Sequence, residues 1–225
     1  MASLHVGQVS APAQSGQAGA SLLSCVADHG SASHPFPTGP AMTSGPYASR
    51  NIADAIHFLC SLHGRQPSVI ELVAGRTIEP AARAWLGEAA EAFARERGYL
   101  ARLAVEAGPV PATPGTGTEA AIAMQRNALL TLAQSERRGC AVGAALAVAA
   151  DWAVIRSVLD AAAERYGVAP QQPWFGKPSS LREVEAALSP ALPVRRALMF
   201  GAEQVALQHR GLWDLLQARA EARAA

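Results

Sequence analysis

Three ionisable residues of this sequence fall on largely apolar helical stripes: Glu96, His209 and, provided the helix is regular there, Glu136. Such stripes face the core of a helical domain, where an unpaired carboxylate is costly. One explanation is structural, with each glutamate paired to an arginine or an imidazole. The candidate arginines are Arg97, Arg126, Arg137 and Arg156. The other explanation is functional, because helix bundles build ligand sites from inward side chains on facing helices.

The spacing of these residues matches no common metal or catalytic motif. A di-iron carboxylate bundle requires Glu-x-x-His on two helices, but no histidine follows Glu96, Glu136 or Glu203 at that spacing. The sequence also contains no Gly-x-Ser-x-Gly, glycine-rich phosphate loop or HExxH. A scattered set of His57, Glu96, Glu136 and His209 could hold one metal ion, but its spacing does not argue for this. We therefore predict no metal or cofactor, and the sequence leaves open whether the protein is an enzyme.

The histidines differ in their expected roles. His57 and His63 lie on one predicted helix, about 240° apart around its axis, so they do not form one chelate. His63 precedes Gly64 at the C-terminal end of that helix, where a cation is favoured, and we expect it to cap the end. His209 lies among apolar residues, so we expect it to be buried, neutral and free of metal.

Residues 118–166 organise the fold. They contain no proline and include the most apolar run of the chain, residues 139–150. A helix that is apolar on every side must be surrounded by other helices. As one straight helix the stretch would span about 73 Å, whereas a compact domain of this size is about 45 Å across. We therefore predict a break or kink between Gln134 and Gly143. The spacing of Gly139 and Gly143 makes a shallow groove, either for a packed backbone or for a flat ligand.

The glycine, proline and capping residues elsewhere in the sequence predict an all-α, single-domain helical bundle around this glycine-kinked central helix. Residues 1–20 read as a disordered N-terminal tail, and 21–48 as an arm with a short helix and an extended surface segment. The bundle domain is 49–225, with linkers at 108–117 and 167–180. We expect its other helices at about 50–63, 67–74, 79–107, 180–188 and 192–222.

Composition excludes several classes of partner. The 19 basic and 18 acidic residues give a formal net charge of +1, so nothing attracts nucleic acid or an anionic membrane. The apolar run is too short to span a bilayer. The three cysteines have no CxxC spacing, and no basic region precedes the first apolar residues. We therefore expect reduced thiols and a cytoplasmic protein.

Several blocks of the sequence resemble an uncharacterised family of small alphaproteobacterial proteins across most of residues 25–220. They are Ala-Asp-Ala-Ile-His-Phe-Leu-Cys-Ser-Leu-His-Gly-Arg at 53–65, Gln-Arg-Asn-Ala-Leu at 125–129, Ser-Glu-Arg-Arg-Gly-Cys-Ala-Val-Gly-Ala-Ala at 135–145, Asp-Trp at 151–152, and Gln-His-Arg-Gly-Leu-Trp-Asp-Leu-Leu at 208–216. This resemblance implies a bacterial cytosolic protein and carries no known activity.

The Gly139-x3-Gly143 spacing is also similar to the distal helix of haem oxygenases, where glycines let the backbone approach the haem plane. That resemblance implies a proximal histidine on an early helix, for which His57 and His63 are the candidates.

We expect a binding or protein-interaction module, with a homodimer as one candidate assembly and an unknown small-molecule ligand. The candidate ligand-binding residues are Glu96, Glu136, Gly139, Gly143 and His209. Phe36, Trp174 and Phe175, on proline-rich loops, are candidate surface contacts, although the commoner use of such residues is to cover the ends of the core. The alternative is a helical-bundle oxidoreductase that binds a metal or haem in its core.

Overall fold

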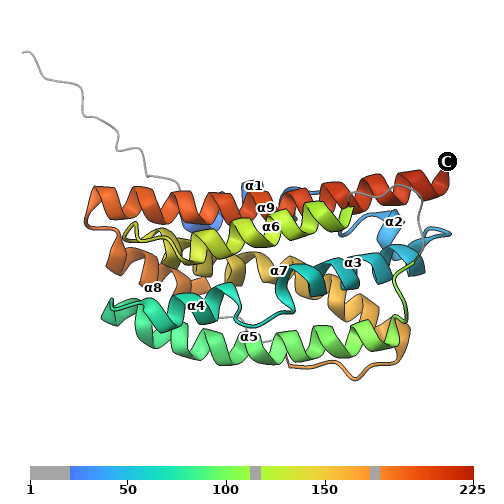
Figure 1. The fold of residues 1–225 in the computed structure, drawn as a ribbon, viewed down its shortest axis with the longest axis horizontal. Helices are drawn as coiled ribbons and strands as arrows, with labels where there is room; N and C mark the ends of the chain where they lie inside the picture. The colour runs from blue at the N-terminus through green and yellow to red at the C-terminus, as the bar shows by residue number, and fades with distance from the viewer. Residues whose placement is uncertain (1–20, 112–117, 173–177) are drawn as a thin grey trace, which may run out of the picture.

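A computed structural model describes residues 21–111, 118–172 and 178–225 of the chain. Within these ranges the regular structure is entirely helical (Figure 1). The elements are α1 (Leu22–His29), the 3₁₀ helix η1 (Ser31–Ser33), α2 (Pro40–Thr43), α3 (Ala48–His63), α4 (Val69–Arg76), α5 (Pro80–Glu106), α6 (Thr118–Ala133), α7 (Cys140–Tyr166), α8 (Pro178–Leu188) and α9 (Leu192–Ala224). The predicted all-α fold is confirmed.

The central stretch divides where its glycines lie. Helix α6 ends at Ala133, and α7 begins at Cys140 after an N-cap glycine, Gly139, with φ of 96°. Residues with a side chain rarely adopt that φ, so glycine is suited to this turn. The predicted break between Gln134 and Gly143 is therefore confirmed.

Helix α7 is the core of the bundle. It has 27 residues and is long and apolar enough, by length and composition alone, to cross a membrane, but 78% of its most apolar window is buried inside the protein. Helices α1, α4, α5, α6, α8 and α9 all pack against it. A core helix has the same composition as a membrane span when other helices cover its whole surface.

Helices α7 and α9 run in the same direction in close contact. A Cβ added at Gly143 would overlap the carbonyl oxygen of Leu198, and one added at Gly201 would overlap that of Cys140. These glycines therefore let the two backbones meet. Of the two uses predicted for the glycine groove, close helix packing is observed at Gly143, where the α9 backbone occupies the space that a flat ligand would need.

The segment before α3 is packed onto the bundle rather than lying extended on its surface. It includes η1 and α2, and α1 and η1 contact both α7 and α9. Phe36 is only 5% exposed and joins the hydrophobic core, so its predicted role as a surface contact is wrong. The predicted tail 1–20, the inner part of both linkers, and Trp174 and Phe175 lie outside the described residues.

Candidate functional site

A chain of buried polar side chains crosses the centre of the bundle. His63 Nε2 lies 3.0 Å from His209 Nε2, and His209 Nδ1 lies 2.6 Å from Asp151 Oδ2. The same carboxylate accepts hydrogen bonds from the Ser31 backbone N–H at 2.9 Å and the Ser31 hydroxyl at 2.5 Å. Trp213 Nε1 donates to the Ser31 hydroxyl at 2.8 Å. None of the five side chains belongs to a residue more than 4% exposed.

The hydrogen-bond partners determine which ring nitrogens carry a hydrogen in this row of buried polar side chains. An Asp151 carboxylate only accepts, so His209 Nδ1 must carry a hydrogen. One hydrogen then lies between the two Nε2 atoms. Burial, and then the neighbouring His209, lowers the pKa of His63 well below its usual 6.5. His63 is therefore neutral at pH 7, because burial disfavours its charged form.

These hydrogen-bonded side chains come from parts of the sequence that are far apart. His63 is the last residue of α3, Asp151 is in α7, His209 is in α9 and Ser31 is in η1. The prediction that His209 is buried is confirmed, since it is 0% exposed. The predicted capping role of His63 is wrong, because its ring turns inward and stacks edge-on against Phe93 and Trp152.

A second buried group adjoins the first. Arg156 Nη1 lies 2.7 Å from Glu96 Oε1, and Trp152 Nε1 donates to Glu96 Oε2 at 3.1 Å. Glu96 is 1% exposed, and the predicted arginine partner is thus confirmed as Arg156. Trp152 separates this ion pair from His63, with the two ring centroids 5.4 Å apart. Glu96 and His209 therefore lie in one continuous layer of the core.

These core groups are already engaged with one another. Among the described residues, no group of three or more His, Cys, Asp or Glu side chains is arranged to hold a metal ion. His57 lies apart, with its Nε2 2.8 Å from the carbonyl oxygen of Gly108. Burial raises the pKa of the Cys60 thiol to about 11, which makes it a weak nucleophile.

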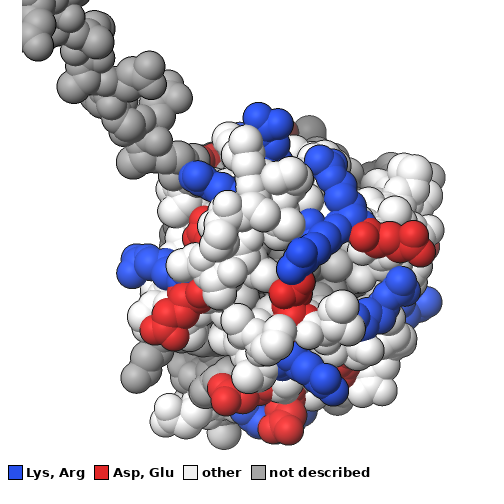
Figure 2. Space-filling model, turned by 90° about the vertical axis from the view of Figure 1, so that its left-hand side faces the viewer, with Lys and Arg blue, Asp and Glu red and all other residues white. Residues whose placement is uncertain are grey.

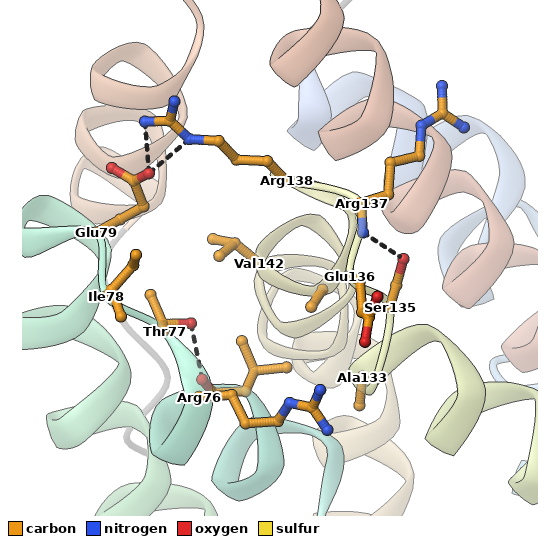
Figure 3. A pocket seen from close by; sticks show the side chains of 13 residues that line it. Arg76, Thr77, Ile78, Glu79, Ala133, Ser135, Glu136, Arg137, Arg138 and Val142 are labelled. Carbon is orange, nitrogen blue, oxygen red and sulfur yellow. Dashed lines mark hydrogen bonds and ion pairs between the residues drawn. The ribbon is translucent and has the colours of Figure 1, made fainter.

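A hollow of about 580 Å³ lies between the α4–α5 link and the α6–α7 link (Figure 3). We call it the link hollow. Its apolar wall consists of Val73, Ala133, Ala141 and Val142. The other lining residues, mostly charged or polar, are Arg76, Thr77, Ile78, Glu79, Ser135, Glu136, Arg137, Arg138 and Gly139. Its volume is within the range of small-molecule sites.

The charges of the link hollow are only partly neutralised. Arg138 lies across the rim from Glu79, 2.6 Å from its carboxylate, while Arg76 lies at another edge (Figure 3). Arg137 lies over the Phe200 ring, 5.9 Å from its centroid. Among the described residues, no ion pair joins Arg76 or Glu136 to a partner. The end of the bundle that contains these links carries interspersed basic and acidic side chains around uncharged surface (Figure 2).

The five predicted ligand-binding residues divide among three places. Glu96 and His209 lie in the buried layer, Glu136 and Gly139 line the link hollow, and Gly143 lies at the α7–α9 crossing. The stripe through Glu136 required a regular helix at that position, and this condition is not met. Glu136 is exposed because α6 ends three residues before it.

Sequence reasoning missed most partners of the buried chain. Asp151 directly follows the apolar run, and its position suggested only the polar end of that run. Ser31 lies in a segment expected to be extended, and the role of Trp213 was not foreseen. A buried histidine predicts some polar partner, but its identity depends on the tertiary fold.

The sequence model of a family of unknown function (DUF6975) matches residues 26–224. The chain belongs to this family. No curated protein and no solved structure matches it. The family assignment therefore carries no activity.

Proposed function

We propose that this member of the DUF6975 family is a binding module whose small-molecule ligand, bearing an acidic group and an apolar portion, occupies the link hollow. The observation that carries the proposal is the link hollow itself, where an apolar wall lies between the side chains of Arg76 and Arg138 (Figure 3). The core supports no rival site, because the inward ionisable groups described above are bonded to one another.

The apolar wall would hold the body of the ligand. Val73, Ala133 and Val142 are at most 5% exposed and fixed by the core behind them, so the wall is preformed. The half-buried Ala141 and the exposed Ile78 supply the apolar surface that a ligand would remove from water, at about 25 cal/mol per Å².

The rim would select an acidic group. Arg76 and Arg138 lie at opposite edges of the link hollow, and Arg138 is already paired with Glu79, so Arg76 is the arginine open to a ligand. Guanidinium groups bind carboxylates and phosphates through paired N–H donors. The first turn of α7 adds weaker support, because N–H groups at a helix start lack intrahelical acceptors and favour anions.

A series of probes with one tail and three head groups tests this proposal. Octanoate, octanol and octylamine share an apolar chain and differ in charge, and binding of each is measured by calorimetry and by chemical-shift changes in the protein amides. We expect octanoate to bind most tightly, with shifts at residues 73–79 and 133–142. Preference for octylamine would show that Glu79 and Glu136 dominate the rim. Shifts confined to other surfaces would refute the link hollow as the site.

Matched variants locate the contact. Arg76→Gln removes a rim charge and should weaken octanoate binding about three- to tenfold, the size of one lost charge-assisted hydrogen bond. Arg95→Gln removes an arginine from the exposed face of α5, outside the link hollow, and should leave binding unchanged. Ala141→Leu should fill the apolar side and weaken all three probes. Equal effects of Arg76→Gln and Arg95→Gln would show that binding depends on the overall charge of the protein and not on the link hollow.

A further inference from the structure

We infer that the Asp151–His209–His63 chain is an acid-sensitive latch, which holds the α3–α4 link, residues 64–68, against the core and opens locally when His63 takes up a proton. This inference is independent of the link hollow.

The position of His63 connects the latch to the link. It is the last residue of α3, and its ring lies 3.0 Å from His209 Nε2 and packs perpendicular to the Phe93 and Trp152 rings. Residues 64–67, immediately after it, are all exposed. A segment with so little buried surface has little else to hold it and is prone to local opening.

The surroundings of His63 do not compensate a positive charge on it. From α9 it meets the His209 imidazole, and behind that lies Asp151 of α7, which is already bonded to His209 and Ser31. From α5 it meets Phe93, and beyond Trp152 lies Glu96, which is paired with Arg156. A protonated His63 would have hydrogens on both ring nitrogens and face His209 in an apolar layer.

The remaining elements around His63 add cations more than anions. Arg65 of the link and Arg126 of α6 line a narrow crevice with His63. Ser68 is the N-cap of α4, and the nearby Glu71 accepts hydrogen bonds from both Arg97 and the Ser68 backbone. The acidic groups here therefore have partners of their own, and water is the available stabiliser of a charged imidazole.

The crevice gives the ring a route to water. It is lined by Leu62, His63, Arg65, Pro67, Ser68, Val69, Arg126, Leu129 and Leu130, and its volume is only about 10 Å³, room for about one water. A protonated ring that turned into it would displace the link and the start of α4. Helices α7 and α9 would stay in place, because their contact at Gly143 and Gly201 does not involve His63.

Hydrogen exchange of the full chain, followed by mass spectrometry at pH 7.5 and 5.0 and corrected for intrinsic exchange, tests the latch. Opening that takes up one proton should become up to about tenfold more frequent per pH unit below pH 6.5. We expect this increase in peptides covering residues 60–72 and not in peptides covering 203–216. An equal increase in both regions would indicate global acid destabilisation and overturn the latch. No increase in residues 60–72 would also overturn it.

Two variants assign the effect to His63. His63→Gln keeps an amide that can bond His209 but does not titrate, so the pH dependence of residues 60–72 should disappear. His29→Gln changes an exposed histidine at the end of α1, and this variant should keep the pH dependence of residues 60–72. A pH dependence that persists in His63→Gln would refute the assignment. Should that variant fail to fold, the comparison of the two regions in the unmodified protein still distinguishes local opening of the latch from global acid destabilisation.

Discussion

Asp151 Oδ2 lies 2.6 Å from His209 Nδ1, and the side chains of both residues are at most 1% exposed. The carboxylate therefore sets the orientation of the imidazole, which in turn presents Nε2 to His63. Because Asp151 also holds Ser31, this contact joins the N-terminal segment, α3, α7 and α9 at one point.

Replacing Asp151 by Asn should destabilise the protein by at least about 2 kcal/mol. The amide has one oxygen, whereas the carboxylate accepts from the Ser31 N–H, the Ser31 hydroxyl and His209 Nδ1. At least one buried donor would lose its acceptor. Urea denaturation at pH 7.5 measures the loss, with Asp28→Asn, at an exposed residue of α1, as control. A change below about 0.5 kcal/mol, the range of ordinary surface substitutions, would show that Asp151 is not essential to the buried chain.

Two glycine-to-alanine substitutions should have opposite effects. At Gly143 the new Cβ would overlap the Leu198 carbonyl oxygen, and forcing α7 and α9 apart should cost about 1–3 kcal/mol. At Gly87, in α5, a Cβ meets nothing within 4 Å, so alanine should stabilise the helix by up to about 1 kcal/mol. Thermal and urea denaturation of both variants provide the comparison. A neutral Gly143→Ala would mean that the two backbones are not in contact, and the larger Gly143→Leu would then also be tolerated.

Glu96 and Glu136 form another matched pair, because the sequence gives them similar settings and the structure does not. Glu96→Gln removes the buried carboxylate of Arg156, which keeps its second partner Asp160, and should cost about 1.5–3 kcal/mol. Glu136→Gln changes an exposed residue of the α6–α7 link and should stay within about 0.5 kcal/mol. Urea denaturation measures both. Equal losses would contradict the assignment of Glu136 to the surface.

Much of the fold could be predicted because local signals decide where helices begin and end. Gly139 and the length limit together indicate the α6–α7 break, and Pro80 indicates the start of α5. The same periodicity failed for Glu136, since a stripe drawn through the break continues a helix that has already ended. Glu96 and His209 were predicted correctly as buried, because each lies in the middle of a long, regular helix.

The composition of the site could not be predicted, because its contacts are distant in sequence. His63 and His209 are 146 residues apart, and nothing in the local pattern around Gly64 shows whether the His63 ring turns inward or caps the helix. The link hollow depends on how two connections lie beside each other. Connections lack the periodicity that reveals a helix face, so the sequence gives no signal for Arg76.

The last prediction concerns the stability of the whole protein against pH. Burial, and then His209, lowers the pKa of His63 in the folded protein, whereas in the unfolded chain it returns to about 6.5. Below pH 6.5 the unfolded state thus binds more protons at His63 than the folded state. Above that pH neither state binds this proton, so His63 should leave the free energy of unfolding constant there. This free energy should fall by up to about 1.4 kcal/mol per pH unit below pH 6.5.

Urea denaturation from pH 7.5 to 5.0 measures this slope, and His63→Gln should remove most of it while His29→Gln should not. The profile should be the same with and without EDTA, because both Nε2 atoms of the histidine pair are directed at each other and His209 Nδ1 at Asp151. If EDTA lowered the stability and flattened the profile, a histidine would be a metal ligand, since protons and chelator then compete for the same site. A slope that His63→Gln leaves intact would instead place the titrating group elsewhere in the fold.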